Sequence, residues 1–323
     1  MGSHLDSVRD GGRYDGALGV VAGFAVAERS RVPLAVIAFA DEEGARYNTP
    51  TFGSRALVGR LEADDVLKRV DASGVPMREA MRNAGVDPDG LMAAPAWLDR
   101  LRGFLELHID QSRDVADCAA PAGVVSGLAA RMRVEVELEG TADHAGTTRR
   151  SERRDALLAA ARLILRADEL ATPEMVATAG RISVEPNAPT TVASHVRLWL
   201  DARAPRPDEL DAWWAKLEGA ANELQEATRV EVRTSVASLN RGTTFDEEVR
   251  AALRLAAGRE GLAAPEVVCF AGHDAGVIAQ RRPAGMVLVR NAAGVSHAPE
   301  ENVDLEDAAT AARVLQAAME ALA

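Results

Sequence analysis

The chain contains six histidines, and four of them lie in polar or glycine-rich segments at the ends of predicted strands. These four are His4, His108, His144 and His297. Ligands of α/β proteins commonly bind where strands end. A lone histidine is more often structural than functional, so the neighbours of each histidine decide its interpretation.

An aspartate accompanies the first histidine. His4 and Asp6 lie on the same side of an extended segment, because side chains alternate with a period of two. Asp6 could therefore hold the imidazole N–H and fix the tautomer of a metal-bound His4. Asp15 follows a glycine-rich turn, GGRYDG, and taken alone it is more simply a turn or helix-cap aspartate.

Three adjacent acids, Asp41, Glu42 and Glu43, come directly after the apolar segment 34–40. An acidic triplet is most often a solvated loop. A cation offers a second interpretation, in which one carboxylate binds the metal and its neighbour remains free as a general base.

Two further segments supply histidines at predicted strand ends. ELHIDQ (106–111) contains His108, and GVSHAPEE (294–301) contains His297. Three histidines and two carboxylates, one of them bridging, would satisfy two borderline divalent metals such as zinc or manganese. The sequence therefore indicates a binuclear metal site.

The elements that must position these residues alternate between helix and strand at both ends of the chain, which predicts an α/β domain with an insertion. Strictly alternating strands in the middle of the chain predict a separate α+β domain. The predicted domain segments are 1–125, 126–238 and 239–323. The predicted helices are 16–29, 54–70, 76–84, 151–170 with Ser151 as its cap, 207–227, 245–260 and 305–322 capped by Asp304. The predicted strands are 31–41, 101–111, 131–140, 191–203, 229–236 and 284–291.

Composition narrows the class of protein. The net charge of −12 argues against nucleic acids and anionic membranes as partners, because both require basic patches. Two distant cysteines, Cys118 and Cys269, make a disulfide scaffold improbable and predict a cytoplasmic protein. No apolar run is long enough for a membrane helix, and no signal peptide opens the chain. Only three residues precede His4, where a longer strand is expected, so we expect a truncated start.

An ordered set of motifs runs through the whole chain. It comprises GSHLDSVRDGGRYDG, DEEGAR, ELHIDQ, GTADHAGTTRRSERRDAL, VEPNA, LDAR, AGHDAGV and GVSHAPE. This set resembles the allantoate amidohydrolase and N-carbamoyl-L-amino acid hydrolase group of the aminoacylase and carboxypeptidase-like zinc peptidases. The resemblance implies a phosphorylase/hydrolase-like α/β catalytic domain with an inserted ferredoxin-like α+β lid that forms a homodimer.

The resemblance also implies a role for each site residue. His4 and His108 would hold one divalent metal, zinc or manganese, Glu43 and His297 would hold the second, and Asp15 would bridge them. Glu42 would be the general base, with Asp6 beside the metal ligands. His144 would reach a substrate in the partner subunit and stabilise its oxyanion. The remaining substrate contacts would come from Gln111, Asn187, Arg203 and Gly272.

The implied reaction is hydrolysis of a C–N bond in a small carbamoyl or ureido carboxylate, with allantoate as the first candidate substrate. N-Carbamoyl-L-amino acid hydrolase and aminoacylase or dipeptidase remain alternatives within the superfamily. An inactive, dimerising remnant is the alternative outside the enzymes. The sequence departs from the family pattern at HIDQS, where Asp110 and Ser112 replace the usual glutamate and glycine, and after PNA, which puts substrate contacts there in doubt.

Overall fold

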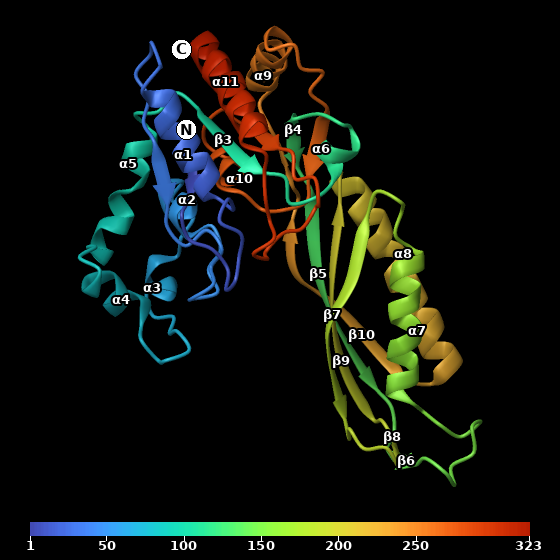
Figure 1. Cartoon of the computed structure of the whole chain (residues 1–323). Coiled ribbons are helices and arrows are strands. Elements are labelled where there is room, and N and C mark those ends of the chain that lie inside the picture. Colours follow the sequence, from blue (N-terminus) through green and yellow to red (C-terminus); the bar gives the residue numbers. More distant parts are fainter. The chain divides into compact units, whose positions relative to one another are not determined.

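The computed structural model describes residues 1–323, which form two compact units (Figure 1). The first unit contains residues 1–128 and 244–323, and the second contains residues 129–243. An insertion between two halves of an α/β unit is therefore present. Its predicted end at residue 238 lies inside strand β10 (Glu231–Asn240), because this strand continues beyond the apolar alternation that marked it in the sequence.

A seven-stranded mixed sheet forms the centre of the first unit, in the order β11-β4-β13-β3-β1-β2, with β12 paired to β4. Strands β1, β2, β3 and β13 run parallel. The strands are β1 (Gly2–His4), β2 (Ile37–Phe39), β3 (Phe104–Ile109), β4 (Ala122–Leu128), β11 (Thr243–Thr244), β12 (Glu266–Cys269) and β13 (Ala284–Val289). The helices are α1 (Ala17–Ala27), α2 (Phe52–Leu57), α3 (Ala63–Val66), α4 (Met77–Asn83), η1 (Pro88–Ala93), α5 (Pro95–Leu98), α6 (Asp114–Asp117), α9 (Glu247–Arg259), α10 (Asp274–Ile278) and α11 (Leu305–Leu322).

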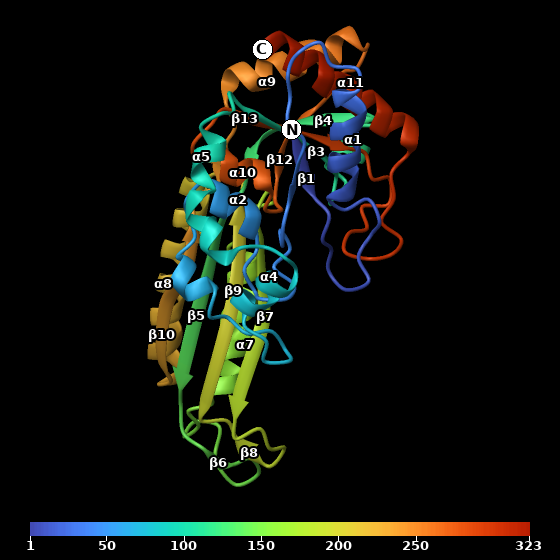
Figure 2. The ribbon, with the colours of Figure 1, turned by 90° about the vertical axis from the view of Figure 1, so that its left-hand side faces the viewer.

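Helices lie on both faces of this sheet, as Figure 2 shows for α1, α9 and α11 against α2, α5 and α10. Side chains of strand β3 pack alternately into the hydrophobic cores on the two faces of the sheet. Leu105, Leu107 and Ile109 belong to the core beneath α1, α9 and α11, whereas Phe104 belongs to the core beneath α10. Because side chains alternate along a strand, Glu106 and His108 project on the α10 side with Phe104.

The second unit has the element order β5-α7-β7-β9-α8-β10 and the antiparallel sheet order β10-β5-β9-β7, which is the ferredoxin-like arrangement. Helices α7 and α8 cover one face of the sheet, and a two-stranded ribbon, β6-β8, lies apart from it (Figure 1). Its elements are β5 (Ala130–Glu139), β6 (Asp143–His144), α7 (Ala156–Glu169), β7 (Val176–Glu185), β8 (Thr191–Val192), β9 (His195–Ala204), α8 (Pro207–Thr228) and β10.

Several predicted elements differ from the structure. The expected strand 31–41 is ordered as a strand only over β2, and the expected helix 54–70 is divided into α2 and α3. Strands β4, β7 and β12 were not predicted. Helix α7 is capped by Asp155, whose carboxylate accepts from the Leu158 amide, and not by Ser151. The caps differ because Asp155, unlike Ser151, directly precedes the first helical turn.

The buried face of α7 differs from the one that its large apolar residues would suggest. The leucines at helical spacing in this segment, Leu157, Leu158 and Leu165, would be expected on the core side of the helix, but all three side chains are exposed. The buried stripe consists of alanines and Leu163, because close helix–sheet packing favours small side chains. Elsewhere, Asp304 caps α11 as predicted. No helix combines the length and the apolar composition required to span a membrane.

Candidate metal centre and active site

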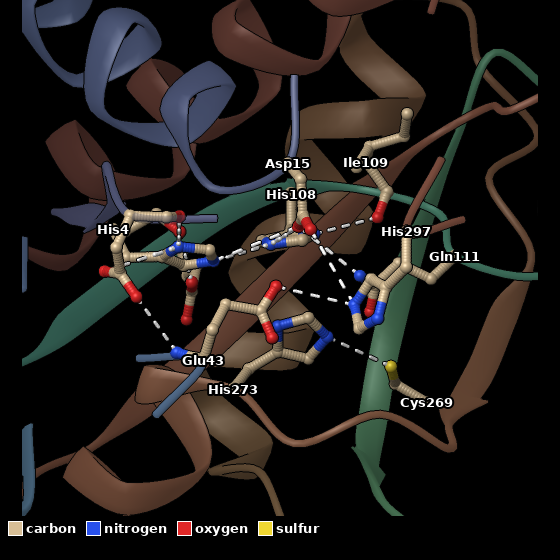
Figure 3. A network of polar contacts seen from close by, with 12 residues as sticks. His4, Asp15, Glu43, His108, Ile109, Gln111, Cys269, His273 and His297 are labelled. Atoms are coloured by element: carbon tan, nitrogen blue, oxygen red, sulfur yellow. Dashed lines mark hydrogen bonds and ion pairs between the residues drawn. The ribbon is translucent and has the colours of Figure 1, made fainter. Parts of the chain in front are cut away.

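Two histidines and one aspartate from three separate segments meet at the end of the first unit's sheet (Figure 3). His4 ends β1, His108 lies near the end of β3, and Asp15 precedes α1. The Nε2 atoms of the two histidines are 3.4 Å apart. Asp15 Oδ1 is 3.3 Å from Nε2 of His108 and 4.0 Å from Nε2 of His4. All three side chains are buried.

The hydrogen bonds of the two imidazoles fix their tautomers. Nδ1 of His4 lies 2.8 Å from the Asp6 carbonyl oxygen, and Nδ1 of His108 lies 2.9 Å from the Ile109 carbonyl oxygen. A carbonyl oxygen can only accept, so each Nδ1 carries the proton and each neutral ring presents a bare lone pair at Nε2. Two nitrogen lone pairs and a carboxylate oxygen therefore converge, an arrangement that is repulsive unless a cation lies between them.

The other oxygen of Asp15 faces a second group of ligand atoms. Asp15 Oδ2 is 3.8 Å from Nε2 of His297, and this nitrogen is 3.4 Å from Oε1 of Glu43. Asp15 Oδ2 is buried and has no hydrogen-bond partner. The carboxylate of Asp15 thus presents one oxygen to each of two ligand groups, as expected for a bridge between two cations.

Burial and mutual repulsion raise the pKa values of the acidic side chains in this region. Burial, followed by the effect of the adjacent Asp15 carboxylate and of the other negative charges nearby, raises the pKa of Glu43 to about 8. Burial and then the charge of Asp6 raise the pKa of Asp41 to about 6. Burial, followed by the charge of Asp274, raises the pKa of the Glu42 carboxyl well above its usual range. Divalent cations bound here would favour the charged forms of these carboxyls.

Residues with unusual backbone conformations lie at the site and beside it. Asp41 and His297 have positive φ angles of 52° and 55°, a backbone conformation that residues other than glycine rarely adopt. Gly16 has a φ of 67°, and a Cβ atom there would lie 2.4 Å from ring atoms of His4. The glycine-rich turn GGRYDG therefore lets the chain pass close to the imidazole on its way into α1.

Two other predicted residues of the first unit lie beside these groups, with one change of role. Nε2 of Gln111 donates to Asp15 Oδ1 at 3.3 Å. The carboxylate of Asp6 was expected to hold the ring of His4, but the Asp6 backbone carbonyl does so, and the carboxylate accepts from the amide of Glu43 at 3.1 Å. Asp6 therefore contacts both the segment that contains His4 and the segment that contains Glu43. Gly272 is exposed and directly precedes α10 and its cap.

Three predicted residues belong to the second compact unit. His144 is exposed on β6, and its Nδ1 accepts from the amides of Gly146 and Thr147. The proton of the neutral ring is therefore on Nε2, which is available as a donor. Asn187 is exposed in the segment between β7 and β8, and Arg203 on β9 donates from Nε to Asp201 at 2.9 Å. The structure does not test their contribution to the metal centre, so it remains a prediction.

Sequence reasoning missed four buried polar residues around the site. The His273 ring contacts the His108 ring with centroids 4.4 Å apart, and its Nε2 is 3.3 Å from Sγ of Cys269. His273 also groups with Glu106 and His108 as potential ligands. The others are Glu106, Asp274 and Glu301. The motif AGHDAGV contained a signal for His273 and Asp274, a histidine–aspartate pair between a strand and a helix, but only packing shows that both are buried.

The donor set suits two borderline divalent metals. It combines imidazole nitrogens with carboxylate oxygens, a combination typical of zinc and manganese sites. Metal-bound histidines almost always donate their second ring N–H to a carbonyl or carboxylate, as His4 and His108 do here. Together with the unpaired Oδ2 of Asp15, these contacts fit a site for divalent cations.

Residues 1–321 match the model of peptidase family M20/M25/M40, and the chain belongs to this family. It is 36% identical to an N-carbamoyl-L-amino acid amidohydrolase of Geobacillus stearothermophilus, over 98% of this chain and 79% of the relative. It is 32% identical to an allantoate amidohydrolase of Bacillus subtilis, over 99% of this chain and 78% of the relative.

Among solved structures, an amidase of the hydantoinase/carbamoylase family from Burkholderia multivorans matches with a TM-score of 0.87 and 29% identity. The match covers 99% of this chain and 79% of that one. The predicted family, the α/β class of fold and the class of enzyme, hydrolases of carbon–nitrogen bonds other than peptide bonds, are confirmed.

Proposed function

We propose that the chain is a binuclear metal-dependent amidohydrolase that hydrolyses the ureido group of a small carboxylic acid. The observation that supports this most strongly is the carboxylate of Asp15, which faces His4 and His108 with one oxygen and Glu43 and His297 with the other. Two cations held there would act as Lewis acids on the carbonyl of the substrate and on the attacking water.

Glu42 is our candidate for the general base. It adjoins the proposed ligand Glu43, is buried, and forms no ion pair that would hold its carboxylate away from the reaction. In this role Glu42 accepts a proton from water as the water oxygen bonds to the ureido carbon. It then passes that proton to the departing nitrogen as the C–N bond breaks.

Replacing Glu42 tests this role. Glu42→Gln should retain both metals and lose turnover by about 10²–10⁴-fold, the usual contribution of general acid–base catalysis. Glu43→Gln is the matched control, because it makes the same change one residue along the chain and should instead lose metal. Elemental analysis and turnover are measured on the same samples. Near-normal turnover of Glu42→Gln would contradict the assignment.

The proposed substrate class is taken from the substrates that appear in the names of the related enzymes. An N-carbamoyl-L-amino acid and allantoate share one fragment, a ureido nitrogen on the carbon that bears a carboxylate. A bidentate guanidinium such as that of Arg203 suits this carboxylate. The motifs favour allantoate, and the relative with 36% identity is an N-carbamoyl-L-amino acid hydrolase, so both belong in the assay.

Ammonia release from a panel of substrates decides between the alternatives. The panel contains allantoate, N-carbamoyl-L-amino acids, their D-enantiomers, N-acetyl amino acids and dipeptides, with free amino acid measured for the last two. Hydrolysis of either ureido substrate supports the proposal. Hydrolysis of acyl amino acids or dipeptides alone would make the chain an aminoacylase or dipeptidase. Turnover of none by the metal-loaded protein would support the inactive remnant.

We also propose that the second unit forms a two-fold dimer. Strand β7 is an exposed edge of its sheet, and Leu158 and Leu165 are exposed on α7 although both are large and apolar. An unpaired edge and an apolar helix face are the features that a second copy of the chain can cover. Light scattering at micromolar concentration measures the mass, and Leu165→Glu should shift it toward the monomer.

A further inference from the structure

We propose that Glu106, together with Ser3, is a positioning residue that fixes the separation of His4 and His108; this inference rests on the proposed metal site. Glu106 is completely buried in β3, two residues before His108. Ser3 immediately precedes His4 in β1 and is also completely buried. Neither residue is among the proposed ligands.

One carboxylate joins three elements of the first unit. The hydroxyl of Ser3 donates to Glu106 Oε1 at 2.7 Å, and the backbone amide of Ala275 in α10 donates to Glu106 Oε2 at 2.7 Å. The partners are separated by 103 and 169 positions in the sequence. Glu106 therefore links the strand that carries His4, the strand that carries His108 and the helix that follows His273.

Although β1 pairs with β2 at all three of its residues, the backbone joins β1 to β3 only weakly. Strand β1 has only three residues, and its pairing with β3 has a single partner pair, Gly2 with Glu106. On its other side β3 pairs with β13 along six residues. The bond between Ser3 and Glu106 is the side-chain contact that adds a second fixed point between β1 and β3. Without it, His4 could move along or away from His108.

Stability alone does not explain a glutamate at this position. Burying a carboxylate is costly unless a positive charge compensates it, and the groups that act electrostatically on Glu106 are His4 and the Met1 ammonium, whose own pKa burial lowers to about 6. Its neighbours Leu105 and Leu107 show that this strand otherwise buries apolar side chains. The carboxylate lies with His108 and His273 in one group of potential ligands, so two cations nearby would supply the missing positive charge.

The expected consequence concerns metal affinity. Ligands must be held within about 0.5 Å of their productive positions, and loss of a residue that orients them typically weakens metal binding about 10–100-fold. Ser3→Ala removes one donor and leaves both histidines in place. Glu106→Gln removes the charge, while its amide oxygen can accept from the Ala275 N–H and its amide nitrogen can donate to the Ser3 hydroxyl oxygen, so it tests the charge separately from the two links.

The experiment titrates the metal-free full chain with Co²⁺ alone and records the visible d–d bands and the stoichiometry. Ser126→Ala is the matched control, because the hydroxyl of Ser126 donates to the Val267 carbonyl at 3.0 Å between two other strands of the same sheet. Thermal unfolding of each metal-free variant measures any purely structural loss. Ser3→Ala keeps the test valid if Glu106→Gln fails to fold.

We expect Ser3→Ala to bind one of two Co²⁺ ions at least tenfold more weakly, with altered d–d bands, while Ser126→Ala binds both as the wild type does. Wild-type affinity and bands in Ser3→Ala would overturn the inference. Equal weakening in Ser3→Ala and Ser126→Ala would overturn it too, because the effect would then be general destabilisation. Failure of the wild type to bind two ions would overturn the proposed function itself.

Discussion

Replacing Asp15 by asparagine should stabilise the metal-free protein and abolish binding of the second metal. Asp15 is buried, and its Oδ2 has no partner in the absence of a cation. An unsatisfied buried polar group costs about 1–3 kcal/mol, more if it is charged. An amide nitrogen at that position can donate to Glu43, and Oδ1 can still accept from Gln111.

The expected size of the effect is measurable. A change of 1 kcal/mol shifts the Tm of a domain of this size by about 2–4 °C, so a gain of about 1–3 kcal/mol should raise the Tm of Asp15→Asn in EDTA by roughly 2–12 °C. The gain should be largest above pH 8, because Glu43, with its pKa of about 8, is then charged beside Asp15. Adding metal should reverse the order, since ligand at 100 times its Kd stabilises the wild type by about 2.7 kcal/mol for each site.

The control makes the same substitution where the carboxylate has a partner. Asp307 accepts from Nε of Arg290 at 2.8 Å, so Asp307→Asn should lower the Tm whether or not metal is present. Scanning calorimetry at pH 9, with EDTA and with Zn²⁺, gives all four comparisons. A metal-free Asp15→Asn that is less stable than the wild type, or one that still gains stability from two metals, would refute the reasoning.

Three further predictions follow from the same residues. The metal-free protein should lose stability as the pH rises from about 4.5 to 8, because Glu43 keeps its proton in the folded chain and releases it in the unfolded chain. Metal loading at pH 7 should release the same proton. Calorimetry in buffers of different ionisation enthalpy detects this release. Gly16→Ala should lose metal, since its Cβ would lie 2.4 Å from the His4 ring; normal metal content would contradict the steric argument. Finally, His144→Ala mixed with Glu42→Gln should regain activity if His144 acts across a dimer, by about 10²–10³-fold over either variant; no recovery after proven subunit exchange would assign His144 to its own chain or to no catalytic role.

Much of the architecture could be predicted from local patterns. The strictly alternating residues of 131–140 correspond to β5, and the apolar run before His108 corresponds to β3. Both follow from side-chain periodicity, which is a property of a short segment. Motif order was sufficient for the family, and the resemblance supplied the five proposed ligands, which the structure brings together in two groups around Asp15.

Other features depend on contacts between distant segments. Leu165 and Leu163 are equally apolar, yet only Leu163 is buried, because the fold decides which side of α7 meets the sheet. Glu106 is one acid among many until tertiary structure brings Ser3 and Ala275 to its two oxygens. The bare nitrogens of His4 and His108 and the unpaired oxygen of Asp15 likewise exist only once three segments have packed together. The sequence by itself indicated which residues are candidates for the chemistry, whereas their burial, tautomers and pKa values arise from tertiary packing, because desolvation and hydrogen bonding depend on what surrounds each group.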